Sequence, residues 1–144
     1  MSNTLNVPTE MVDHLRSGVH IELGAVAQEI SNASDRYRRQ SHPEWFSEPF
    51  RRLDAIRALL EVAGWSTSGY GQEIEIDLDV HRVELLAALT SQLEVERNIK
   101  QELDREHAHR SARHEATQRV LELGRFVAAV KLCMQSSQLP EVGR

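Results

Sequence analysis

The chain of 144 residues carries 22 acidic and 17 basic side chains, a formal net charge of −5, and 40% of its residues are hydrophobic. Because a chain of this length buries about 68–70% of its unfolded surface, we expect one domain over residues 1–144. The acidic balance argues against indiscriminate nucleic-acid binding, and one cysteine excludes an internal disulfide. Apolar runs are short and the N-terminus lacks a signal-peptide pattern, so we expect a cytoplasmic protein without a membrane span.

The first predicted element is a helix over about residues 8–37. Its apolar residues recur at steps of three and four from Val12 to Tyr37, which is the period of one buried helix face. Gly18 and Gly24 interrupt this pattern. Each lowers the intrinsic helix propensity by about 1 kcal/mol, and we interpret them as points where a neighbouring helix can approach closely.

A second helix is predicted over about residues 48–63, preceded by a short helical turn at 43–46. A capping-box pattern from Ser41 to Glu44 indicates the turn, and Pro49 suits the first turn of the main helix. Gly64 stands where a helix usually ends. Phe46 and Phe50 fit the apolar stripe and are predicted to lie in the core.

Residues 73–80 change period, because polar and apolar residues alternate strictly there. This alternation predicts a half-buried strand, which needs a partner for its backbone groups. The favoured partner is residues 4–7, which form a two-stranded β-ribbon with 73–78. The alternative is pairing of 73–78 with its copy in a second subunit. Asp77 or Asp79 is the expected N-cap of the following helix.

The rest of the chain predicts two helices, at about 79–106 and 112–136, with a frayed tail over 136–144. Val83 belongs to the apolar face expected for the first of them. The stretch between the two helices is polar on every side, so we place a reversal there, and one long helix is the alternative. The predicted fold class is therefore all-α, a four-helix up-down bundle with a minor β-ribbon.

Seven histidines invite a metal hypothesis. Di-metal bundles of the ferritin-like kind use Glu-x-x-His on two helices, and here that motif occurs once, at Glu106 and His109. Because the motif lies in the predicted turn, the preferred interpretation is a solvated histidine-rich segment. Cys133 stands alone and is interpreted as a buried structural thiol. We expect no metal and no cofactor.

Nucleic acid is a second alternative. Arg36, Arg38 and Arg39 flank Tyr37, and arginines interleaved with aromatics are typical of single-strand binders. A solvated helix end explains the same residues, because cations favour helix C-termini. We therefore regard nucleic acid as an unlikely partner.

Aromatic residues gather between positions 45 and 70, where five of the seven in the chain lie. Such residues form interface hot spots as well as core anchors. Trp45, Trp65 and Tyr70 are the candidate partner-binding residues, although the tryptophans can equally close the ends of the bundle.

These patterns favour a non-enzymatic helical protein that acts through protein–protein association, with itself as the expected partner in a homodimer. No assembled catalytic motif is present in the sequence, which makes an enzyme the less favoured class. The alternatives are a small-molecule or metal-binding bundle that uses Glu106 and His109, and a nucleic-acid-binding regulator that uses the arginine patch.

Overall fold

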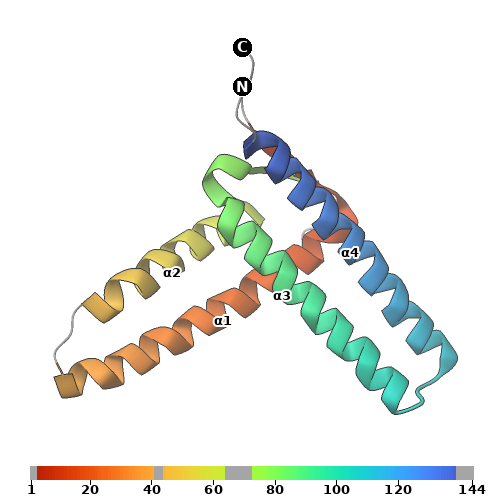
Figure 1. Cartoon of the computed structure of the whole chain (residues 1–144), viewed down its shortest axis with the longest axis horizontal. Coiled ribbons are helices and arrows are strands. Elements are labelled where there is room, and N and C mark those ends of the chain that lie inside the picture. Colours follow the sequence, from red (N-terminus) through yellow and green to blue (C-terminus); the bar gives the residue numbers. More distant parts are fainter. Residues whose placement is uncertain (1–2, 41–43, 64–72, 139–144) are drawn as a thin grey trace.

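The structure, a computed structural model, describes residues 3–40, 44–63 and 73–138, and it describes side chains over 3–34, 47–63 and 73–135. Within these ranges the fold is mainly helical, with four helices packed against one another and a small antiparallel sheet (Figure 1). The elements in chain order are β1 (Thr4–Val7), α1 (Thr9–Gln40), α2 (Glu44–Ala63), β2 (Ile74–Asp77), α3 (Leu78–Arg105) and α4 (Arg110–Gln138). The predicted fold class is therefore confirmed.

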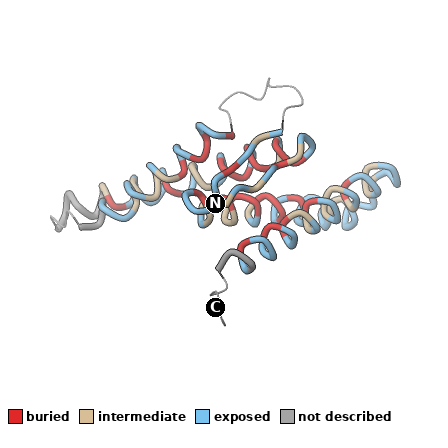
Figure 2. Tube along the Cα trace, turned by 90° about the horizontal axis from the view of Figure 1, so that it is seen from above, coloured by how far each residue is buried: buried red, intermediate tan, exposed pale blue. Residues whose placement is uncertain are grey.

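The helices form two antiparallel hairpins that cross (Figure 1). Helices α1 and α2 make one hairpin, and α3 and α4 make the other. The hairpins meet where α1 crosses α3, and their far ends diverge. Helices α1 and α3 are consequently the central elements, since each contacts all three other helices. The buried positions concentrate around the crossing (Figure 2).

The β-ribbon closes within one chain. Strands β1 and β2 are antiparallel, with Leu5 opposite Ile76 and Val7 opposite Ile74. Val7 and Ile76 are fully buried, so one face of the ribbon leans on the helices, as a two-stranded sheet requires. This confirms the predicted pairing and removes the alternative in which the strand pairs with a second subunit.

Strand β2 ends at Asp77 because that residue caps α3. Its backbone is extended, and its side chain accepts a hydrogen bond from the Asp79 backbone N–H at 2.9 Å. The helix therefore begins at Leu78, one residue before the predicted start at 79. Of the two expected N-caps, Asp77 is the one used.

Gly18 lies at a close approach between α1 and α3. A Cβ atom built on it would lie 2.0 Å from the backbone oxygen of Ala88, far inside van der Waals contact. Gly24 is exposed, and a Cβ there would meet nothing within 4 Å. The interpretation of these glycines as close-approach points is thus correct for Gly18 and wrong for Gly24.

Buried polar groups tie the helices together. The Arg16 Nε donates to the backbone oxygen of Ala63 at 2.7 Å, which satisfies a terminal carbonyl of α2. The Glu96 carboxylate on α3 accepts from Arg119 Nε at 3.0 Å and from Gln92 Nε2 at 3.2 Å. These contacts join α1 to α2 and α3 to α4, beside a core of leucine and valine side chains.

The two-helix interpretation of the C-terminal half is confirmed. Helix α3 ends in a Schellman motif, in which the Ala108 N–H bonds to Leu103 O at 2.9 Å and the His107 N–H to Asp104 O at 3.3 Å. His107 takes the left-handed position of this motif, with φ of 52°. Helix α4 continues to Gln138, so the first residues of the predicted frayed tail are helical, and 139–144 lie outside the described residues.

Helix α2 corrects the prediction of a separate turn before a main helix. It is continuous from Glu44, with Pro49 inside it. Pro49 is the sixth residue of α2, so it lies beyond the first turn and removes the backbone hydrogen bond to residue 45. The proposed cap at Ser41 lies outside the described residues.

Three residues expected in the core lie at the surface. Phe50 is 46% exposed, Val83 is 72% exposed, and Cys133 is exposed. Cys133 lies beside the buried Met134, one helical step of about 100° away, which turns it out of the core. Across residues 3–40, 44–63 and 73–138, the helices lack the apolar length that a membrane crossing requires.

Candidate functional site: the outward face of helix α3

The outward side of α3 carries an apolar ridge, formed by Val83 and Ala87, which we call the Val83 ridge. Val83 is the most exposed large hydrophobic residue among those described, at 72%. The opposite side of α3 packs inward and buries polar residues as well as leucines. That buried set is Leu78, His81, Leu85, Ala88, Leu89, Gln92, Leu93 and Glu96.

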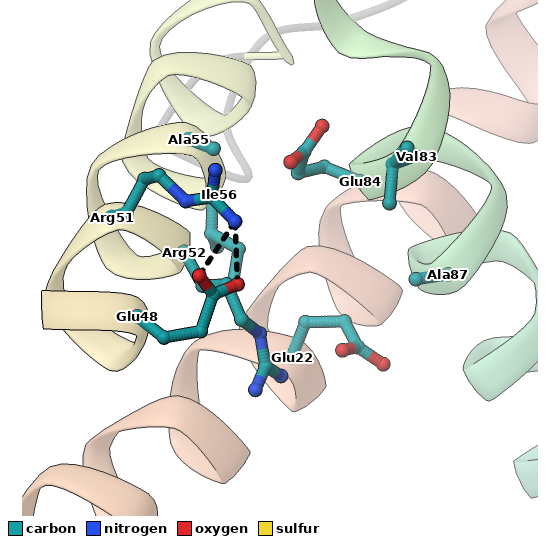
Figure 3. A pocket seen from close by; sticks show the side chains of 9 residues that line it. All are labelled: Glu22, Glu48, Arg51, Arg52, Ala55, Ile56, Val83, Glu84 and Ala87. Carbon is teal, nitrogen blue, oxygen red and sulfur yellow. Dashed lines mark hydrogen bonds and ion pairs between the residues drawn. The ribbon is translucent and has the colours of Figure 1, made fainter. Parts of the chain in front are cut away.

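A groove runs along one flank of the ridge, between α2 and α3 and above α1 (Figure 3). Its volume is about 540 Å³. It is lined by Glu22, Glu48, Arg51, Arg52, Ala55, Ile56, Val83, Glu84 and Ala87. Three carboxylates and two guanidinium groups surround the small apolar residues, so we call it the acidic groove.

The arginines of the acidic groove are held by carboxylates. Arg51 pairs with Glu48 one turn earlier on α2, at 2.6 Å, and Arg52 pairs with Glu29 of α1 at 2.7 Å. The hydrogen bond and charge of Glu48 raise the pKa of Arg51, and the Glu84 charge on α3 raises it further. The Glu84 side chain points across the groove toward Arg51, as Figure 3 shows.

A second groove follows the other flank of the ridge, between α3 and α4. Its volume is about 700 Å³. It is lined by Glu22, Arg82, Val83, Leu86, Ala87, Thr90, Ser91, Lys131, Met134 and Gln135. Two cations and one carboxylate line it, so we call it the basic groove.

The two grooves are parts of one surface. Glu22, Val83 and Ala87 line both of them, and the Glu22 carboxylate accepts a hydrogen bond from the Ser91 hydroxyl at 2.5 Å. Glu84 and Lys131 form no ion pair within 4 Å with any residue that the structure describes. The ridge with its two grooves, which we call the α3 face, therefore combines an exposed apolar centre with flanking charged side chains, most of which are paired within the chain.

The metal candidates Glu106 and His109 both lie exposed in the α3–α4 turn. His109 caps α4 there, because its Nδ1 accepts from the Ser111 backbone N–H at 3.2 Å. No group of three or more His, Cys, Asp or Glu side chains among the described residues is arranged to hold a metal ion. The burial and convergence that the metal hypothesis requires are thus not met at this pair.

The other candidate residues fall mainly where side chains are not described. Trp45 lies in α2, but its side chain is outside the described set, and Trp65 and Tyr70 lie in the undescribed stretch 64–72. The side chains of Arg36, Arg38 and Arg39 are likewise outside it. Arg51 and Arg52, the next arginines along the chain, are paired with carboxylates.

Comparison of the chain with known protein families, with curated proteins and with solved structures gave no match.

Periodicity could not identify the α3 face, because it assigned Val83 to the buried stripe. The structure shows the reason. Val80 and Val83 follow a strand that ends at a capping aspartate, and His81 between them occupies the buried side. Surface helices usually bury apolar residues and expose polar ones, whereas α3 buries His81, Gln92 and Glu96 and exposes valines.

Proposed function

We propose that this protein works by binding another protein through the α3 face, and not by catalysis. The observation that carries the proposal is the exposure of Val83, at 72%, on a ridge with a groove along each flank. An apolar centre rimmed by polar and charged groups is typical of protein-binding surfaces. Helical partners use such surfaces by laying an apolar side into a groove.

The shape of the surface also favours a protein ligand. The two grooves lie side by side along the ridge, and both combine apolar and charged side chains in their lining. An extended partner could contact the ridge and both flanks together. Val83 would lie at the centre of such an interface, where its apolar surface is removed from water.

The proposal is tested by photo-crosslinking from defined positions. A photoreactive amino acid is placed at position 83, and in a matched variant at position 132. Leu132 is 64% exposed on α4 and lines neither groove, so it controls for exposure. We expect a discrete crosslinked protein from position 83 in the cells that express the chain, and its loss when Glu84 and Lys131 are both replaced by alanine. Equal, diffuse crosslinking from both positions would contradict the proposal.

A further inference from the structure

We draw no further inference here: the strongest candidate, the Val83 ridge with its two flanking grooves, belongs to the site already described, and nothing in the structure shows which partner covers it.

Discussion

Alanine substitutions at Gly18 and Gly24 are expected to change stability in opposite directions, although both glycines lie in the same helix. Alanine is more favourable than glycine in a helix interior by about 1 kcal/mol. At Gly24 nothing lies within 4 Å of the new methyl group, so Gly24→Ala should stabilise the protein by about that amount. Gly124 on α4 offers the same open surroundings as a second control.

At Gly18 the added Cβ would lie 2.0 Å from Ala88 O, whereas ordinary contact starts at 3.4 Å. Helices α1 and α3 must therefore separate by roughly the difference between these distances, and the obstacle is backbone, which no rotamer change can move. Overpacking of a well-packed site costs about 1–3 kcal/mol, occasionally more. Because the obstacle is backbone, we expect this overpacking cost to be about 3 kcal/mol or more. Subtracting the gain in helix propensity leaves a net loss of about 2 kcal/mol in the free energy of unfolding.

Urea unfolding followed by far-ultraviolet circular dichroism measures both changes. The midpoint concentration should fall for Gly18→Ala and rise for Gly24→Ala, with the same slope for both if unfolding stays two-state. Measurements at low protein concentration keep association from adding to the apparent stability. A Gly18→Ala protein as stable as Gly24→Ala would refute the close crossing of α1 and α3.

Three further predictions concern helix ends and the buried carboxylate. His107→Gly should stabilise the protein by about 1 kcal/mol, because glycine adopts the left-handed position at C′ without the Cβ penalty. His114→Gly, within α4, should destabilise the protein by a similar amount, and urea unfolding of both variants measures the two changes. Asp77→Ala should cost about 1 kcal/mol through loss of the α3 cap, whereas Asp77→Asn should retain most of the stability, as thermal unfolding would show. Arg119→Met should cost about 1–3 kcal/mol because it removes a hydrogen bond from the buried Glu96. Adding Glu96→Gln should recover part of that loss, because it removes the unpaired charge and keeps an oxygen that accepts from Gln92 Nε2. A double-mutant cycle that shows simple additivity would contradict this coupling.

The features that were predictable from sequence are those that local chemistry determines. The alternation around residues 73–78 identified a strand, and the only similar segment, 4–7, identified its partner. The capping aspartate and the polar stretch after Leu103 located the start of α3 and the reversal before α4. Each of these signals acts within a few residues, so tertiary packing had little opportunity to override it.

The side of α3 that faces outward was not predictable in the same way. Burial on a helix is set by how many neighbours it has and where they lie, and α3 contacts α1, α2 and α4. These neighbours enclose a broad arc that includes Gln92 and Glu96, whose polar groups are hydrogen-bonded. Hydrogen bonds make such burial acceptable, whereas a hydropathy pattern counts the same residues as solvent-facing. Val83 was therefore assigned to the core.

The central position of α3 also explains why its exposed ridge is suited to association. Helix α2 flanks the ridge on one side and α4 on the other, and the contacts of α1 with α3 hold both hairpins in place. Gly18 permits that crossing to be close, and the Glu96–Arg119 hydrogen bond anchors α4 to α3. A partner thus meets a surface whose grooves are already formed, and binding to a preorganised surface costs less ordering entropy. Substitutions that loosen the crossing should therefore weaken association as well as stability, even though Gly18 lines neither groove.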